Sequence, residues 1–146
     1  MPRKPPTSKT EYEILADFRY ALRRFLRFSE SAARDVGLTP QQHQALLTIR
    51  GFPGREQITV GELAERLQVR HHSAVGLVDR LEAEKLIRRT RAADDRRKVY
   101  ITLTARGDRL IEQLSALHRE ELRRMTPELR ALIRHIEDLS EADNRP

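Results

Sequence analysis

The densest run of charged side chains in the sequence lies between Arg88 and Lys98. It contains six basic residues and two acids, which gives this short segment a net charge of +4. Guanidinium and ammonium groups at this density suit the binding of a polyanion. Asp94 and Asp95 are surrounded by cations that keep them ionised, so they are poor candidates for general acid or base catalysis. The chemistry that this run favours is therefore binding.

Other residue combinations that carry chemistry are absent from the sequence. It contains no cysteine, which excludes a disulfide framework, a thiolate metal site and a thiol redox switch. It has no Gly-rich phosphate loop and no Gly-x-Ser-x-Gly turn. His71 and His72 are adjacent, so they diverge on a helix, and no carboxylate lies beside them at zinc-ligand spacing. We expect no catalytic residue, no metal and no cofactor, and we do not expect an enzyme.

A strand must hold the charged run, because apolar and polar residues alternate directly after it. Val99, Ile101 and Leu103 share one face, and Tyr100 and Thr102 share the other. This alternation is typical of a half-buried strand. We therefore expect a hairpin over residues 87–103 with the charged residues at its tip.

Two short helices are predicted before the hairpin. Thr39 with Gln42, and Thr59 with Glu62, have the spacing of capping boxes. The helix over residues 71–86 has a periodic apolar face that predicts burial. This face consists of Ala74, Leu77, Val78 and Leu81. The residues nearer its open side are His71, His72, Ser73, Val75, Gly76 and Arg80.

Long amphipathic helices are predicted at both ends of the chain. Residues 11–37 form one, and residues 105–146 form two, the second beginning at Thr126 with Pro127 behind it. Their apolar stripes either complete an intramolecular core or bind a second copy. We favour the dimer, because three long helices exceed what one small domain must cover. His118 and His135 are expected to be ordinary surface residues of these helices.

The fold class that follows is mainly helical with a small β-wing. Residues 38–104 form a winged helix-turn-helix, in which the helix over 71–86 is shaped to enter a major groove. The terminal helices flank it as dimerisation helices. Residues 1–10, "MPRKPPTSKT", are expected to be a basic flexible arm rather than a signal peptide. No apolar run approaches a membrane span, so we expect no membrane partner and a cytoplasmic protein.

Three segments resemble the MarR family of bacterial transcriptional regulators. They are "TVGELAERL" (59–67), "LVDRLEAEKLIRR" (77–89) and "DRRKVYITLT" (95–104), the last followed by Gly107. The resemblance implies a homodimer, built from the terminal helices, that binds a pseudo-palindromic operator in double-stranded DNA. It also places the wing motif of the family on Asp95 and Arg97, with Arg97 in the minor groove and Asp95 bracing the wing. A narrow minor groove concentrates negative potential and favours a guanidinium.

The sequence departs from the family at the recognition helix, where it has Val75 and Gly76 in place of the Thr and Arg of many relatives. Neither side chain can form a hydrogen bond with a base edge, although Val75 can contact a thymine methyl. Phosphate contacts are expected from Arg70, the wing and the N-terminal arm. The complete set of expected DNA-binding residues is Arg70, His71, His72, Ser73, Val75, Gly76, Arg80, Asp95, Arg96, Arg97 and Lys98.

The function expected from these features is that of a dimeric, sequence-specific DNA-binding transcriptional regulator, a repressor released by a small-molecule effector. Arg24, Phe25 and His43 are the candidate ligand-pocket residues, and His43 alternatively fills a domain interface. A second hypothesis is a sequence-tolerant architectural DNA-binding protein without an effector, which Val75 and Gly76 favour. A third is a protein-interaction module, which leaves the segment 95–104 unexplained.

Overall fold

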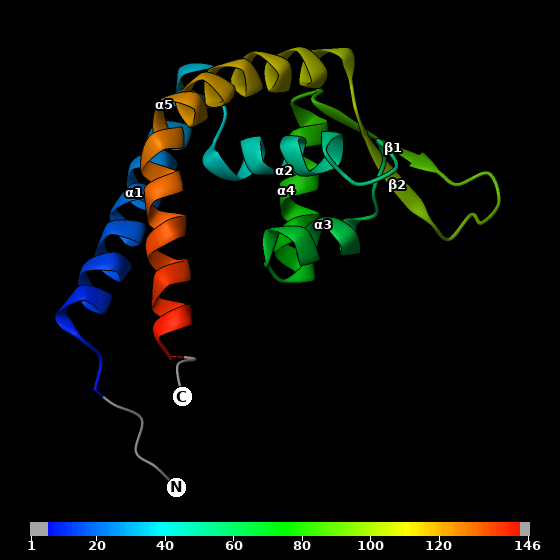
Figure 1. Ribbon diagram of the computed structural model, residues 1–146. Coiled ribbons are helices and arrows are strands. Elements are labelled where there is room, and N and C mark those ends of the chain that lie inside the picture. Colours follow the sequence, from blue (N-terminus) through cyan, green and yellow to red (C-terminus); the bar gives the residue numbers. More distant parts are fainter. Residues whose placement is uncertain (1–5, 144–146) are drawn as a thin grey trace, which may run out of the picture. The chain divides into compact units, whose positions relative to one another are not determined.

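The computed structural model of the protein describes residues 6–143 (Figure 1). The mainly helical fold with a two-stranded wing is confirmed. In chain order, the elements in this range are α1 (Lys9–Asp35), α2 (Pro40–Arg50), α3 (Val60–Leu67), α4 (His71–Ala83), β1 (Ile87–Arg91), β2 (Val99–Leu103) and α5 (Ala105–Asp143).

The chain divides into two compact units. Residues Glu30–Leu117 form the first, which we call the winged unit. Of the described residues, 6–29 and 118–143 form the second, which we call the helix-pair unit. The two long helices α1 and α5 therefore contribute to both units.

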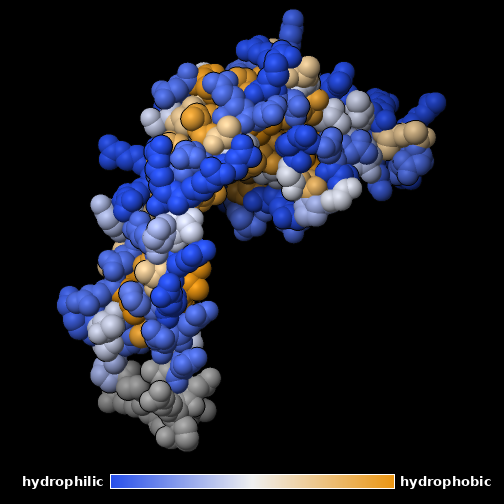
Figure 2. Space-filling view, turned by 45° about the horizontal axis from the view of Figure 1, so that its top comes forward, coloured by the Kyte–Doolittle hydropathy of each residue, from blue (hydrophilic) through white to orange (hydrophobic). Residues whose placement is uncertain are grey.

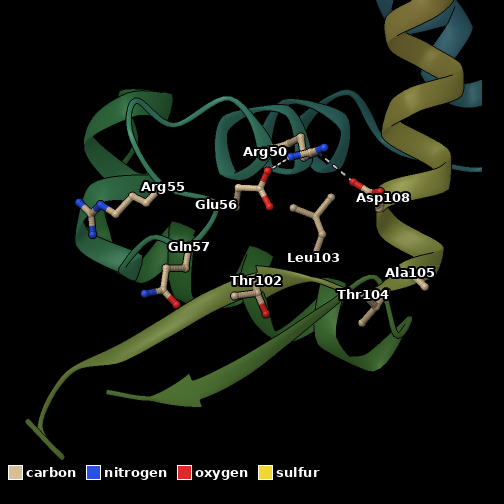
Figure 3. A pocket seen from close by; sticks show the side chains of 9 residues that line it. All are labelled: Arg50, Arg55, Glu56, Gln57, Thr102, Leu103, Thr104, Ala105 and Asp108. Atoms are coloured by element: carbon tan, nitrogen blue, oxygen red, sulfur yellow. Dashed lines mark hydrogen bonds and ion pairs between the residues drawn. The ribbon is translucent and has the colours of Figure 1, made fainter. Parts of the chain in front are cut away.

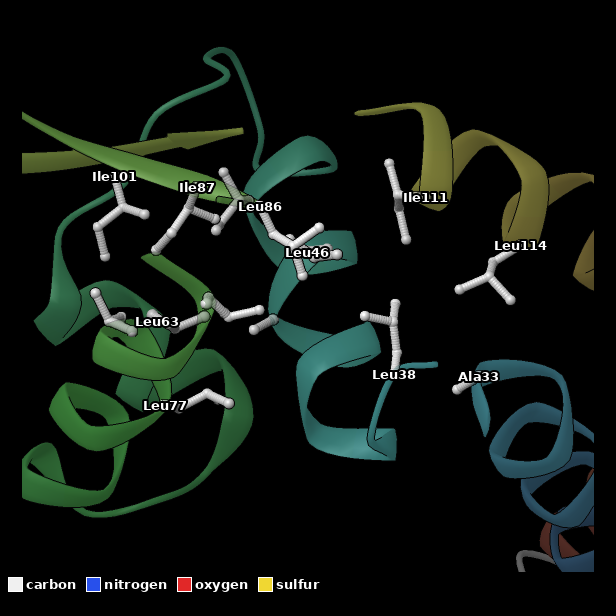
Figure 4. Close-up of a cluster of buried hydrophobic side chains, with 14 of the residues drawn as sticks. Ala33, Leu38, Leu46, Leu63, Leu77, Leu86, Ile87, Ile101, Ile111 and Leu114 are labelled. Carbon is white, nitrogen blue, oxygen red and sulfur yellow. The ribbon is translucent and has the colours of Figure 1, made fainter. Parts of the chain in front are cut away.

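The winged unit is built around one continuous apolar core (Figure 4). Leu46 of α2, Leu63 of α3 and Leu81 of α4 are fully buried in it, together with Ile101 of the wing. The predicted apolar face of α4 is confirmed, since Ala74, Leu77, Val78 and Leu81 are all buried. Because protein interiors are close-packed and hardly compressible, this core holds α4 and the base of the wing in a fixed relative position.

Local capping interactions define the ends of the short helices, as the sequence predicts. The Thr39 hydroxyl accepts from the Gln42 N–H at 3.1 Å, and the Gln42 side chain accepts from the Thr39 N–H at 2.9 Å. Thr59 and Glu62 form the same reciprocal pair at the start of α3. Such boxes satisfy amide groups that a helix start leaves without intrahelical partners.

The wing is an antiparallel hairpin in which Ile87 pairs with Leu103 and Arg91 pairs with Val99. Ile58, in the connection before α3, extends it by exchanging two backbone hydrogen bonds with Ile101. On the predicted inner face Ile101 is fully buried, and Leu103 packs against the core. The sequence did not predict the bridge at Ile58.

The helix-pair unit has a much smaller core. Ala21 of α1 packs with Met125 and Leu132 of α5, and Phe25 and Leu129 lie partly buried beside them. Hydrophobic side chains also reach the surface of this unit between hydrophilic ones (Figure 2).

The prediction of two C-terminal helices is wrong, because α5 runs unbroken through Pro127. Proline lacks the N–H that would bond to the carbonyl one turn earlier. The apolar stripe of Met125, Leu129 and Leu132 nevertheless continues on both sides of the proline and packs within the helix-pair unit. Thr126 does not cap a new helix, since its hydroxyl donates to the Leu122 carbonyl at 2.8 Å. Packing along the stripe outweighs the missing hydrogen bond.

Two predicted boundaries also shift. The basic arm was expected to extend to residue 10, but α1 begins at Lys9, whose ammonium lies 3.6 Å from the Glu13 carboxylate. Residues 1–5 lie outside the described range. The recognition helix ends at Ala83 rather than at residue 86, because Lys85 adopts a left-handed conformation with φ 59°. The Leu86 N–H then bonds back to the Leu81 carbonyl at 2.9 Å, as in a Schellman motif.

His118 is not an ordinary surface residue. Its Nε2 lies 2.8 Å from the hydroxyl of buried Ser29, and its ring contacts Phe25 and Phe28 edge-on. The prediction for His118 is therefore wrong, whereas His135 is exposed as expected. Sequence periodicity placed the two histidines on separate helices and gave no indication of these long-range partners.

Candidate nucleic-acid interface

Helix α4 presents a polar, exposed surface on the side away from the core. Arg70, His71, His72, Ser73 and Arg80 are all exposed, while Val75 and Gly76 are half-buried. Arg70 is the N-cap residue, and its side chain does not cap the helix. The start of α4 thus combines exposed cationic and polar side chains with backbone amides, which is a suitable environment for a phosphate group.

The tip of the wing is ordered by Asp95. Its carboxylate accepts a hydrogen bond from the Arg97 N–H at 3.0 Å, and the Arg97 Nε lies 3.5 Å from the same oxygen. An aspartate that bonds to the backbone two residues later stabilises a tight turn. The Arg97 side chain itself is 94 % exposed. The geometry agrees with the bracing role that the family resemblance implies for Asp95, and it leaves the guanidinium directed into solvent.

Apart from Arg97, the cations of the wing fall into two groups. In the described part of the chain, Arg88, Arg91, Arg96 and Lys98 are exposed and form no ion pair. Arg89 differs, because its guanidinium bonds to Asp79 at 2.5 Å and to Glu82 at 2.9 Å. The hydrogen bond with Asp79, reinforced by the charges of both acids, raises the pKa of Arg89. Arg89 therefore ties β1 to α4 and is not part of the exposed cationic surface.

The turn after α4 is anchored to the start of α5. The Thr104 hydroxyl donates to the Lys85 carbonyl at 2.7 Å and accepts from the Gly107 N–H at 3.1 Å. A Cβ atom at Gly107 would lie 2.1 Å from the Leu86 carbonyl oxygen, so only glycine fits. Gly107 was part of the family resemblance, and this close backbone approach is its physical reason.

A second anchor joins the start of α3 to the preceding loop. Glu62 forms an ion pair with Arg55, whose guanidinium lies over the Phe52 ring at 4.7 Å from its centroid. Burial by itself raises the pKa of the Glu62 carboxyl. Hydrogen bonds from Thr59 and the charge of Arg55 outweigh this and lower the pKa below its ordinary value.

The predicted ligand-pocket residues have different environments in the two units. Arg24 and Phe25 belong to the helix-pair unit, where Arg24 pairs with Glu128 at 3.1 Å. Phe25 lines an apolar hollow of about 120 Å³. His43 belongs to the winged unit, where it is only 2 % exposed.

A larger pocket, which the sequence did not reveal, lies in the winged unit (Figure 3). It measures about 630 Å³. Arg50 lies at its wall and pairs with Glu56 and, at 3.0 Å, with Asp108. The lining comes from α2, the following loop, β2 and α5, so no local sequence pattern identifies it. None of the predicted site residues lines it.

Among the described residues, no group of three His, Asp or Glu side chains is arranged to hold a metal ion. Within the same range, every helix is too short or too polar to cross a membrane.

Comparison with known proteins identifies a family to which part of the chain is similar. Residues 36–98, which include α2 to α4 and most of the wing, match the MarR family. The sequence of this segment is similar to that of the MarR family. This match contains the segments 59–67 and 77–89 and the first residues of the segment 95–104, on which the sequence resemblance was based, whereas Gly107 lies outside it.

A curated bacterial regulator is also similar to part of the chain. The chain is 35 % identical over 80 residues to the HTH-type transcriptional repressor MdtR of Bacillus subtilis, an alignment that covers 55 % of this chain. The aligned region spans 50 % of that relative's length. The named relative is a transcriptional regulator, in agreement with the expectation that the chain is not an enzyme.

Two solved structures show the same fold. A MarR family protein from Bacillus stearothermophilus superposes with a TM-score of 0.75 at 23 % identity, covering 97 % of this chain and 100 % of that chain. A mutant of MepR from S. aureus, bound to an oligodeoxyribonucleotide, superposes with a TM-score of 0.64 at 21 % identity, covering 90 % of this chain and 96 % of that chain.

Proposed function

We propose that this chain is a dimeric, sequence-specific DNA-binding transcriptional regulator of the MarR family that represses a promoter and is released by a small molecule. The observation that carries the proposal is the combination, on one rigid core, of the exposed face of α4 and the exposed guanidinium of Arg97. A helix and an adjacent basic wing on one scaffold suit a major groove and a neighbouring minor groove. The MepR structure with an oligodeoxyribonucleotide supports DNA as the polyanion.

Charge on the winged unit supports the same partner. The exposed cations Arg70, Arg88, Arg91 and Lys98 provide phosphate contacts, which are salt-sensitive and position a protein on DNA. The side chains of His71, His72 and Ser73, at the start of α4, are polar groups that can form hydrogen bonds with base edges. The cytoplasmic location expected from the sequence is part of this proposal.

The exposed apolar residues of the helix-pair unit support the dimer. Leu15 and Phe18 of α1 and Leu122, Ile133 and Ile136 of α5 are more than two-fifths exposed. Large apolar side chains gathered on one surface are typical of an interface. A second copy presenting the same surface buries them and places two recognition helices on a two-fold symmetric operator.

The proposed release from DNA by a small molecule is based on the similarity to the MarR family and on candidate pocket residues that can be tested. We propose that an effector contacts Arg24 and Phe25 of the helix-pair unit and favours a spacing of the recognition helices that does not match the operator. Screening for compounds that lower operator affinity, followed by the same titration with Arg24→Ala and Phe25→Ala, tests it. Unchanged sensitivity in both variants would exclude these residues from the site.

The decisive experiment is fluorescence anisotropy on the intergenic DNA beside the gene and on a shuffled duplex of equal length. An operator-specific regulator binds the native fragment at least about a thousandfold more tightly at near-physiological salt. Equal binding of both duplexes, abolished by added salt, supports the second candidate, an architectural DNA-binding protein. The observation that favours this candidate is the absence of hydrogen-bonding side chains at Val75 and Gly76.

A further inference from the structure

Gly76 occupies the middle of α4 although the fold has room for a side chain there. The nearest atom to a Cβ built at Gly76 is Nη1 of Arg80, at an ordinary contact distance of 3.8 Å. Gly107, by contrast, is required by a backbone contact of 2.1 Å. Glycine inside a helix is destabilising relative to alanine. Packing within the chain therefore explains Gly107 and leaves Gly76 without an internal reason.

The space that Gly76 leaves open is covered by the guanidinium of Arg80. Side chains on a helix lean toward its N-terminus, so a residue lies over the position four residues earlier. Arg80 is exposed and forms no ion pair with any described residue. The neighbouring acids are engaged by other groups. Asp79 and Glu82 bind Arg89, and Glu84 accepts a hydrogen bond from Gln42 at 3.1 Å. The donors of Arg80 are therefore available along the exposed face.

We propose that Arg80 is a specificity-determining residue that recognises guanine, and that Gly76 keeps its path along the helix open. This inference rests on the proposed function, because it needs α4 to lie in a major groove. A guanidinium donates two parallel hydrogen bonds to O6 and N7 of guanine, whereas Val75 and Gly76 donate none from their side chains. The glycine thus allows a long side chain from the second half of α4 to extend toward its N-terminal half, the part of a recognition helix that contacts bases.

The test begins with selection of preferred sequences by the wild-type full-length chain from a random pool of duplexes. Each guanine in the selected site is then exchanged, with its partner, for an A·T pair, and binding is followed by anisotropy. The wild type is expected to lose roughly tenfold or more in affinity at the guanine that Arg80 contacts. Arg80→Gln and Gly76→Leu should bind the original and exchanged duplexes alike. Arg109→Gln, which removes the same charge from an exposed position on α5, should retain the preference.

The outcomes separate the two proposals. If Arg80→Gln keeps the guanine preference to the same extent as Arg109→Gln, the role of Arg80 is overturned and the regulator assignment stands. If Arg80→Gln loses it but Gly76→Leu keeps it, the role of the glycine is overturned. If the wild type selects no sequence, the operator-specific function fails, and the role of Arg80 fails with it. Circular dichroism of each variant verifies that the helix content is unchanged.

Discussion

The winged unit and the helix-pair unit differ in how completely they bury their apolar side chains. In the winged unit, residues from α2, α3, α4 and the wing meet in one core in which Leu46 and Ile101 are fully buried. In the helix-pair unit, Leu15 is 57 % exposed and Ile133 is 56 % exposed. Among the residues that the structure describes, eight of the ten exposed large hydrophobic ones belong to the helix-pair unit. The winged unit thus buries its apolar side chains by itself and exposes a charged surface, while the helix-pair unit exposes an apolar surface.

The largest expected effect is a loss of stability of the winged unit. Gly107→Ala places a Cβ against the Leu86 carbonyl and should lower the free energy of unfolding by about 3 kcal/mol or more, because backbone on both sides resists the shift. Urea denaturation measures this loss. Gly61→Ala in α3 is the matched control, since its Cβ meets nothing closer than 3.9 Å, and it should not destabilise. Equal stability of the two variants would contradict the packing described for Gly107.

The next effect addresses the apolar surface of the helix pair. Ile133→Glu should weaken the dimer at least about a hundredfold, because a charge would be buried without a partner in the interface. Sedimentation equilibrium measures the dissociation constant. Ala131→Glu introduces the same charge at an exposed position of α5 outside the apolar stripe and should leave the dimer intact. A wild-type chain that is monomeric at micromolar concentration refutes the dimer outright.

The surface of the winged unit is tested through the exposed cation Arg97. Arg97→Ala should weaken operator binding by about 1 to 3 kcal/mol, as expected for the loss of a groove contact. The folded stability should change little, because the side chain is 94 % exposed. Anisotropy titrations at several salt concentrations separate the loss of one charge from the loss of a groove contact, with Arg109→Ala as the charge-matched control. Unchanged affinity of Arg97→Ala would rule out the wing as a DNA contact.

A smaller effect on stability is expected at Lys85, in the turn after α4. Lys85 has a left-handed backbone, which costs energy for every residue except glycine. Lys85→Gly should therefore stabilise the winged unit by about 1 kcal/mol, whereas Lys85→Ala should leave its stability nearly unchanged. Thermal and urea denaturation measure the difference between the two variants. A destabilised Lys85→Gly protein would show that the side chain of Lys85 contributes more than its backbone strain removes.

The smallest effect is a pH dependence within the winged unit. The pKa of Glu62 is lowered in the folded chain, so its carboxylate contributes stability above the unfolded pKa and loses it as the pH falls through the folded pKa. The stability advantage of the wild type over Glu62→Gln should therefore shrink as the pH falls from about 5 to about 3. Glutamine is a fair substitute, because Gln42 fills the same capping position in α2. An advantage that does not change over this range would contradict the lowered pKa.

Much of the winged unit was predictable because its signals are local. The capping boxes at Thr39 and Thr59 join residues three apart, and the buried face of α4 follows from helical periodicity alone. The continuity of α5 was not predictable, because packing in the helix-pair unit decides it against the local signal of Pro127. The contact of His118 with Ser29 and the bond of Arg89 to Asp79 were missed for a similar reason, since each joins different elements.

The candidate DNA-binding surface was predicted in position but not in its electrostatics. The sequence placed Asp95 and Arg97 together on the tip, and the structure adds the hydrogen bond that orders the turn. Counting charges along the hairpin included Arg89 among the cations available to a polyanion. The structure removes it, because Asp79 and Glu82 neutralise it from α4. The assignment of individual residues to DNA contacts is still a prediction for the experiments above.

The sequence by itself determined the order of the elements, their caps and the faces that must be buried. These properties depend on interactions between residues a few positions apart, which the spacing of residue types records directly. Tertiary structure alone decided which cations are free, why Gly107 must be glycine, and that Gly76 is open and covered by Arg80. Each of these depends on distances of a few ångströms between side chains or backbone atoms whose positions are set by the packed core, and one-dimensional spacing does not contain those distances.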